Sequence, residues 1–221
     1  MTIAFALTQV AAFSTTIYLH RGVTHRALAL HPAIAWCFRF ALWITTGLST
    51  REWVAVHRKH HMYPDKEGDP HSPHLHGFWS VQLGNVFYYV REARNGDTVE
   101  KYARDIKPDG WDRWLVNHGF LGPIIGTAAL CGLIGGGWGL LAAGLHGVVN
   151  VFFLSSSISA LCHARGYRMF ENTATNIGWL ALSPAARDSI TITTASPAAP
   201  SSARARANWI QAGRSSPCSP V

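Results

Sequence analysis

Two long apolar runs frame a polar central region of the chain. Residues 1–19 contain no charged side chain, and residues 120–161 are apolar over enough length to cross a bilayer twice. A helix rises about 1.5 Å per residue, so about 20 residues cross a hydrocarbon core of about 30 Å. The triplet Gly135-Gly136-Gly137 divides the second run and predicts a turn between two helices. We therefore predict membrane spans near residues 1–19, 120–136 and 138–161.

The composition agrees with a membrane protein. Of the 221 residues, 48% are hydrophobic and 14% are charged, and 9 are Trp, which is apolar for a soluble domain. A net charge of +7 suits nucleic acid or an anionic membrane surface, and the apolar runs favour the membrane and argue against nucleic acid. Most charged residues lie between Arg51 and Asp112, so the positive-inside rule predicts that this region faces the cytoplasm. We expect an all-α integral membrane protein, with transmembrane helices and a cytoplasmic helical portion.

Three histidines, His57, His60 and His61, lie within five residues in this polar region. If the segment is helical, the spacings i, i+3 and i+4 place them on one face. Three neutral imidazoles on one face form half of a metal site, because imidazole binds iron, copper, zinc and nickel well. The alternative is a solvated basic cluster in which Arg58 and Lys59 carry the charge.

A second pair, His20 and His25, follows the first apolar run. A spacing of five does not place two residues on one face of a straight helix, so we expect the backbone to bend there. In this order, the segments HRGVTH and HRKHH resemble the first two histidine boxes, HxxxxH and HxxHH, of membrane-bound fatty acyl desaturases. The flanks YLHR, HRAL and KEGDPHSP agree, and CHARGYR around His163 is similar to the late single-histidine motif of the family. The resemblance covers about residues 1–182 and implies a fatty acid desaturase domain.

The chemistry implied by the resemblance is oxidative. Removing hydrogen from an unactivated methylene needs an oxidant, which proteins obtain by activating O₂ at a metal. The resemblance implies a centre of two non-haem irons (Fe) that takes electrons from a separate ferredoxin- or cytochrome b5-like donor. Its product is a cis double bond in a long-chain acyl group, carried as a fatty acyl thioester such as acyl-CoA or as an acyl lipid. By position, the implied iron ligands are His20, His25, His57, His60, His61 and His163.

Three further positions receive weaker roles from the resemblance. The family usually has an asparagine four residues before the late histidine, where it is thought to hold a metal-bound water. Ser159 occupies this position here, and a hydroxyl can still hold a water. Asp69 and Arg165 are implied contacts near the acyl head group, with structural salt bridges as the alternative. We predict that the histidines of the Pro-rich loop are solvated rather than ligands, namely His71, His74 and His76.

A third apolar run, residues 33–48, separates the two boxes and contains Arg39 at its middle. If this run crossed the bilayer, the boxes would lie on opposite faces and could not share a metal centre. We therefore predict an interfacial helix near 33–48 that lies in the plane of the membrane surface or packs on the polar portion. Trp53, just beyond it, is expected to be a core or interface anchor. Family members usually have another span before residue 1, so we expect a truncated N-terminus or a late start codon.

The family pattern ends at the tail. The family has a third box, HxxHH, in a Gly-Glu-Gly context soon after the late motif, whereas residues 164–221 contain no histidine. Residues 183–221 are instead rich in Ala, Ser, Pro, Thr and Arg, a composition typical of disorder. With permitted codons and one added base, residues 182–197 read Leu-Leu-Thr-Gly-Gly-Glu-Gly-Leu-His-His-Asn-His-His-Gly-Phe-Ala. In the same frame, residues 207–213 read Glu-Leu-Asp-Pro-Ser-Trp, which is also typical of the family. We hypothesise that residues 183–221 are the product of a frameshift.

Three functions compete at this point. The first is an acyl-CoA or acyl-lipid desaturase, an oxidoreductase of lipid metabolism, impaired by loss of the third box because a depleted ligand set binds metal weakly. The second is a related diiron hydroxylase, which the flanks of the boxes fit less well. The third is an inactive membrane metal-binding remnant of an enzyme. Iron content separates the first from the third.

Overall fold

The structure, a computed structural model, describes residues 1–115 and 118–164, apart from the side chains of residues 115 and 161–164. All regular elements in these ranges are helices, as predicted, and η1 and η3 are π-helices. In chain order they are α1 (Thr2–Ser14), η1 (Thr15–Thr24), α2 (Pro32–Thr46), α3 (Thr50–Met62), α4 (Pro73–His76), α5 (Phe78–Ala93), α6 (Gly96–Tyr102), α7 (Gly110–Leu115), α8 (Leu121–Ile134), α9 (Gly136–Val148), η3 (Val149–Ser155) and α10 (Ser156–Ala164).

The first helix does not stop at the predicted boundary near residue 19. It continues from α1 through η1, where the backbone changes from α-helical to π-helical hydrogen bonding. Two hydroxyls bond back to the preceding turn at this change, because Ser14 Oγ donates to the Val10 carbonyl (2.7 Å) and Thr15 Oγ1 to the Ala11 carbonyl (2.9 Å). Such hydroxyls compete for carbonyls that would otherwise accept only main-chain N–H groups, and they often bend helices.

Close contact between α2 and α8 depends on two glycines, Gly122 and Gly126. A Cβ atom at Gly122 would lie 2.0 Å from the Trp43 carbonyl oxygen, and one at Gly126 would lie 2.6 Å from that of Ile44. The spacing of four places both glycines on one helix face, the small-xxx-small arrangement that lets helix backbones approach in membranes. The helix α2 covers most of the predicted stretch 33–48 and packs against α1 and α8, and its place at the membrane surface stays a prediction.

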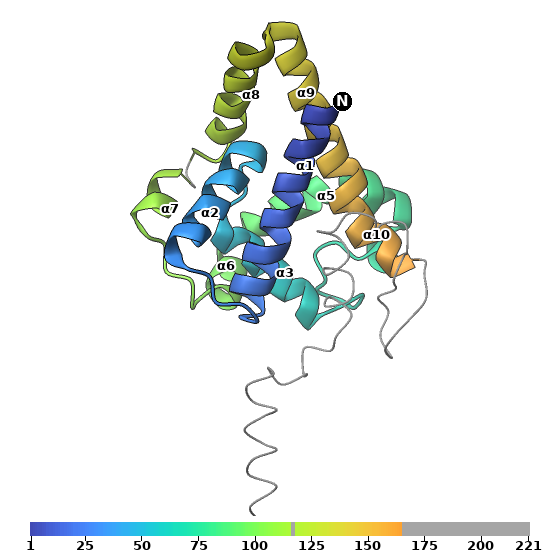
Figure 1. Cartoon of the computed structure of the whole chain (residues 1–221). Coiled ribbons are helices and arrows are strands. Elements are labelled where there is room, and N and C mark those ends of the chain that lie inside the picture. The colour runs from blue at the N-terminus through green and yellow to red at the C-terminus, as the bar shows by residue number, and fades with distance from the viewer. Residues whose placement is uncertain (116–117, 165–221) are drawn as a thin grey trace, which may run out of the picture.

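The α8–α9 hairpin projects beyond the other helices (Figure 1). Its turn is at Gly135, with φ of 91°, inside the glycine triplet that predicted it. One side chain, His146, ties the lower part of the hairpin to its neighbours: Thr8 Oγ1 and His146 Nδ1 are 3.0 Å apart, and His146 Nε2 lies 3.1 Å from the Thr45 carbonyl. His146 is buried, so its role is to join α9 to α1 and α2.

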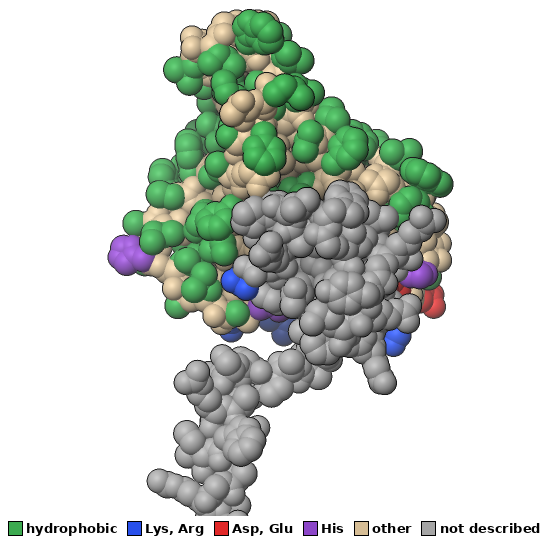
Figure 2. Space-filling view, turned by 45° about the vertical axis from the view of Figure 1, so that its right-hand side comes forward, with side chains coloured by type: hydrophobic (Ala, Val, Ile, Leu, Met, Phe, Trp, Pro, Cys, Tyr) green, Lys and Arg blue, Asp and Glu red, His purple; other side chains and the backbone are tan. Residues whose placement is uncertain are grey.

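Two helices in the described part of the chain are long and apolar enough to cross a membrane, Thr2–Thr24 and Gly136–Ala160. They match the first and third predicted spans, whereas α8 has 14 residues and is shorter than the predicted second span. Figure 2 shows hydrophobic side chains over the projecting hairpin and, in that view, charged side chains at the opposite end. The exposed large apolar residues of the hairpin include Ile124, Leu133, Trp138, Leu140 and Leu141.

Candidate metal centre

His20 and His25 meet because η1 is a π-helix. In a π-helix the amide of residue i+5 bonds to the carbonyl of residue i. The His25 amide donates to the His20 carbonyl at 3.0 Å, and the Nε2 atoms of the two rings are 3.2 Å apart. The structure therefore replaces the predicted bend with a wider helical turn, and this turn brings residues five apart together.

His57 and His61 come from α3, which begins at the N-cap Ser49. The Ser49 hydroxyl accepts a hydrogen bond from the Glu52 amide (3.4 Å), and this caps the helix. The spacing of four places the Nε2 atoms of His57 and His61 3.0 Å apart. Trp53 stacks on the His57 ring with centroids 4.5 Å apart, so it touches the site as well as the core. Its spacing of four from His57 is the signal that could have predicted this contact.

The two pairs converge. Ligand nitrogens of His20, His25, His57 and His61 all lie within 4.8 Å of one another. Two imidazoles bound to one ion at about 2.0–2.1 Å in tetrahedral geometry have nitrogens about 3.3–3.4 Å apart, close to the 3.0 and 3.2 Å found within the pairs. The donor set is thus suited to a transition metal, since imidazole is the preferred ligand of iron, copper and zinc.

The electrostatics favour the neutral form of two of these rings, His57 and His25. Burial holds the pKa of His57 well below its usual value, and the neighbouring rings of His61, His20, His60 and His25 lower it further. Burial also lowers the pKa of His25, with a smaller contribution from Arg58. A metal ligand must offer a free lone pair, so suppressing protonation favours metal binding.

His60 does not join this group, although it is adjacent to His61. Its Nδ1 lies 3.0 Å from both carboxylate oxygens of Asp69, which also accepts the amides of Asp65 (2.9 Å) and His71 (3.1 Å). His60, Asp69 and His71 form a second cluster, in which the atoms that could bind a metal all lie within 4.8 Å of one another. The prediction that His57, His60 and His61 act from one face is therefore only partly right, because one turn of α3 faces two clusters.

The structure also bears on the expectations for Asp69 and for the loop histidines. Asp69 is buried and its carboxylate orients His60, which agrees with the alternative of a structural salt bridge, and a contact of Asp69 with the acyl head group stays a prediction. His71 is buried against His60 with ring centroids 4.8 Å apart, so the prediction of a solvated loop histidine is wrong for it. His74 is exposed, as predicted, and His76 stacks on Tyr88.

The basic residues between the histidines are not a solvated cluster. Lys59 Nζ pairs with Glu92 at 2.6 Å, and Arg58 pairs with Asp105 at 2.6 Å. The side chains of Lys59 and Arg58 are 19% and 21% exposed, so both are largely covered. These pairs join α3 to α5 and to the segment after α6.

The late motif is only partly described. Ser159 lies half-buried in α10, and α10 packs against α5. Gln82 of α5 donates to the Phe152 carbonyl in η3 (2.7 Å) and to Ser157 Oγ in α10 (3.2 Å). His163 lies in the last turn of α10, and the predictions for its side chain, for Arg165 and for residues 183–221 fall outside the described residues.

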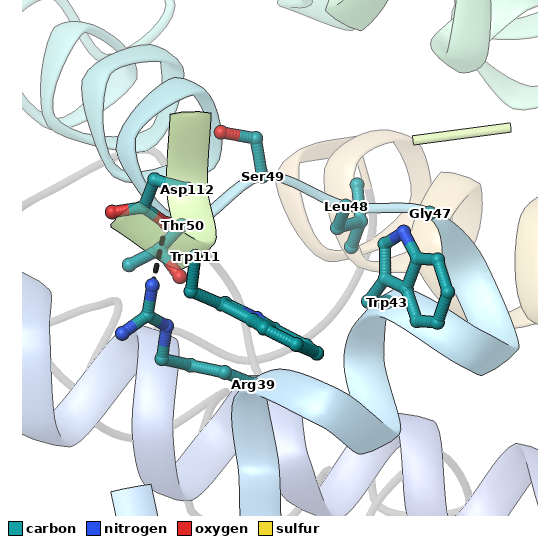
Figure 3. Close-up of a pocket in the computed structure, with 8 residues that line it drawn as sticks. All are labelled: Arg39, Trp43, Gly47, Leu48, Ser49, Thr50, Trp111 and Asp112. Carbon is teal, nitrogen blue, oxygen red and sulfur yellow. Dashed lines mark hydrogen bonds and ion pairs between the residues drawn. The ribbon is translucent and has the colours of Figure 1, made fainter. Parts of the chain in front are cut away.

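A small pocket beside α2 is separate from the histidines (Figure 3). Its cavity volume of about 20 Å³ has room for about one water molecule. The residues that line it are Arg39, Trp43, Gly47, Leu48, Ser49, Thr50, Trp111 and Asp112. Arg39 Nη2 pairs with Asp112 at 2.6 Å across it, and a cavity of this size does not fit an acyl chain.

Comparison with known proteins gives one consistent class of relatives. The chain is 31% identical over 174 residues to the delta-9 desaturase-like 3 protein of Arabidopsis thaliana, a match of 76% of the chain and 56% of that protein. It is 30% identical over 193 residues to the hex-5-enoyl-[acyl-carrier protein] acetylenase of Moorena producens (strain JHB), a match of 76% of the chain and 57% of that protein. It is 29% identical over 195 residues to the acyl-CoA C20 Delta5-desaturase of Anemone leveillei, a match of 81% of the chain and 58% of that protein. The chain thus spans a little over half the length of these relatives, and no protein-family model matches it.

Proposed function

Because the chain belongs to the fatty acyl desaturase family, we propose that its histidine clusters are the metal centre of an O₂-dependent acyl desaturase. The observation that carries the proposal is the convergence of His20, His25, His57 and His61 from two separate helices. The alternative of a related hydroxylase has no observation in its favour, since the relatives named above include desaturases.

Two metal positions follow from the two clusters. The first is held by the four imidazoles of His20, His25, His57 and His61. His60, whose Nδ1 lies on Asp69, belongs to a second position, and His163 is a proposed ligand there. Two non-haem irons bound at these positions supply the activation of O₂ that removes hydrogen from a methylene. The residues of this chain hold the irons, keep the imidazoles neutral and orient His60.

The proposed setting is a membrane. The helices Thr2–Thr24 and Gly136–Ala160, together with the hairpin of α8 and α9, insert into the bilayer. The histidine clusters then face the cytoplasm, as the charge distribution of the central region favours. The proposed substrate is a long-chain acyl thioester or acyl lipid, with O₂ and a separate electron donor as the other partners.

We further infer that these 221 residues alone do not desaturate. Residues 164–221 contain no histidine, and an altered reading frame over residues 183–221 accounts for the missing third box. The first metal position does not depend on that box, since its four imidazoles precede residue 62. A metal-binding protein without activity is therefore the second candidate function for the chain as written.

A pair of genes that differ by one base tests the proposal. Both versions are expressed in a host that lacks its own desaturase, one as written and one with the frame restored after residue 182. We expect double bonds in cellular fatty acids, measured by gas chromatography and mass spectrometry, only with the restored frame. Unsaturated products from the chain as written would contradict the inferred impairment, and none from either version, both present in the membrane, would contradict the desaturase assignment.

A further inference from the structure

Asp105 lies in the segment after α6, far in sequence from both histidine boxes, and contacts both. Arg58, which follows His57, binds it with two hydrogen bonds: Nη1 to Oδ1 at 2.6 Å and Nη2 to Oδ2 at 3.2 Å. Arg26, which follows His25, donates from Nη2 to the same Oδ2. One carboxylate therefore holds the residue next to a histidine in each box.

Arg58 makes the link between the boxes direct. Its Nη2 also donates to the carbonyls of Val23 (3.1 Å) and Thr24 (3.4 Å), the two residues before His25. Its Nη1 donates to the Tyr102 carbonyl (2.9 Å) at the end of α6. A planar guanidinium can bind a carboxylate and carbonyls together in this way, and a lysine cannot.

The backbone at Arg26 is an independent sign of constraint. Its φ of 52° lies in the left-handed region, which a residue other than glycine adopts at a cost and keeps only where its surroundings fix it. The fixing contacts are the pair with Asp105 and the hydrogen bond from the Ala27 amide to the Arg21 carbonyl (2.9 Å). These contacts lie directly after His25, the C-cap of η1.

We propose that Asp105 is a positioning residue that sets the separation of the two histidine boxes by holding Arg26 and Arg58. It touches no histidine of either cluster, and acts through the backbone next to His25 and through α3 next to His57. We call the contacts of Asp105 with Arg26 and Arg58 the clamp. The consequence for metal binding rests on the proposed function, whereas the clamp itself exists without metal.

The test compares Asp105→Asn with Asp109→Asn in the full chain. Asp109 is a matched control because it also pairs with an arginine, Arg39, at 2.7 and 3.0 Å, but this arginine is in α2 and adjoins neither box in the sequence. Asparagine keeps the shape of the side chain and removes its charge. Arg58→Lys is a second variant that keeps the charge but loses the double hydrogen bond.

The first readout needs no metal. Hydrogen exchange of a peptide covering residues 20–27 reports the His25 and Ala27 amides, which bond to His20 and Arg21. We expect exchange about tenfold faster in Asp105→Asn and Arg58→Lys than in Asp109→Asn. Equal exchange in Asp105→Asn and Asp109→Asn would overturn the proposal, whatever the metal data show.

The second readout is Co²⁺ titration followed by its visible absorption. We expect Asp105→Asn to weaken Co²⁺ binding by about 10- to 100-fold, the range for partners that orient metal ligands, and to change the shape of the spectrum. Asp109→Asn should match the unmodified chain in both. Unchanged affinity and spectrum in Asp105→Asn would contradict the positioning role, whereas absence of Co²⁺ binding in the unmodified chain would contradict the proposed metal site and leave the exchange result to decide the clamp.

Discussion

The His25 amide donates to the His20 carbonyl, and the same turn places the two Nε2 atoms 3.2 Å apart. On a straight α-helix, residues five apart point about 140° away from each other. The π-helix thus brings two histidines with the HxxxxH spacing close enough to bind one metal ion together. π-helical turns are rare and are found frequently at functional sites, and this one supplies half of the four-imidazole cluster.

Removal of His57 should abolish tight metal binding while the fold remains. Its ring contributes one of four nitrogens, so we expect His57→Ala to weaken Ni²⁺ or Co²⁺ affinity by at least about tenfold. Isothermal titration measures the change. The control is His118→Ala, at an exposed histidine that contacts the Trp114 carbonyl. Equal affinity in the two variants would remove His57 from the site.

Asp69→Asn should destabilise the loop that orients His60. The buried carboxylate accepts hydrogen bonds from His60, Asp65 and His71, and losing a charged acceptor of this kind costs about 1.5–3 kcal/mol. We expect a lower thermal unfolding midpoint by circular dichroism. The exposed Asp97 provides the control, and a midpoint for Asp69→Asn equal to that of Asp97→Asn would show that the network is not stabilising.

Gly122→Ala should disrupt the contact of α8 with α2. The new methyl group would overlap the Trp43 carbonyl, and overpacking of this kind costs about 1–3 kcal/mol. In Gly132→Ala, on the same helix, the methyl group meets nothing within 4 Å, so this variant should keep or slightly raise the unfolding midpoint. Similar midpoints for both variants would contradict the close helix contact.

Acid should weaken the contribution that Asp105 makes to the stability of the fold. The hydrogen bonds from Arg58, and secondarily from Arg26, lower the pKa of Asp105 to about 2, against the effect of burial. A carboxyl with a depressed folded pKa stabilises the fold above its unfolded value of about 3.9, and this is lost as pH falls through about 2. Because the group is one-third exposed, the contribution is at most about 1 kcal/mol.

The measurement for this prediction is the unfolding midpoint at pH 5 and pH 3. The midpoint of the unmodified chain should fall more between these values than that of Asp105→Asn, which has no carboxyl to protonate at this position. Parallel slopes in the two proteins would show that Asp105 contributes nothing to the acid sensitivity.

The sequence was sufficient to predict an all-helical chain and to single out the histidines of the candidate site, because hydrophobic runs and motif spacing are local properties. It predicted the helix α2, the turn at Gly135 and a shared helix face for His57 and His61, whose metal-binding role stays a proposal. It did not predict how His20 reaches His25, since π-helical hydrogen bonding has no simple spacing signal. Nor did it separate His60 from His61, because the difference is set by Asp69, nine residues beyond His60.

Contacts between distant segments were also beyond the sequence. The burial of His71 depends on the fold of the loop around Asp69, and the approach of α8 to α2 depends on which face Gly122 presents. The contacts of Arg26 and Arg58 with Asp105 join residues up to 79 positions apart in the sequence. Such contacts are set by tertiary packing, for which a single sequence carries no periodic pattern.

Metal content of the purified 221-residue chain, measured by mass spectrometry after loading with Fe²⁺ without oxygen and removal of the excess, tests the central claim most directly. The nitrogens of His20, His25, His57 and His61 all lie close enough together to bind one ion, so the account predicts about one tightly bound iron per chain. Chains without iron would show that the cluster is not a metal site. Two irons per chain would show that a full centre forms without the third box, and would contradict the inferred impairment.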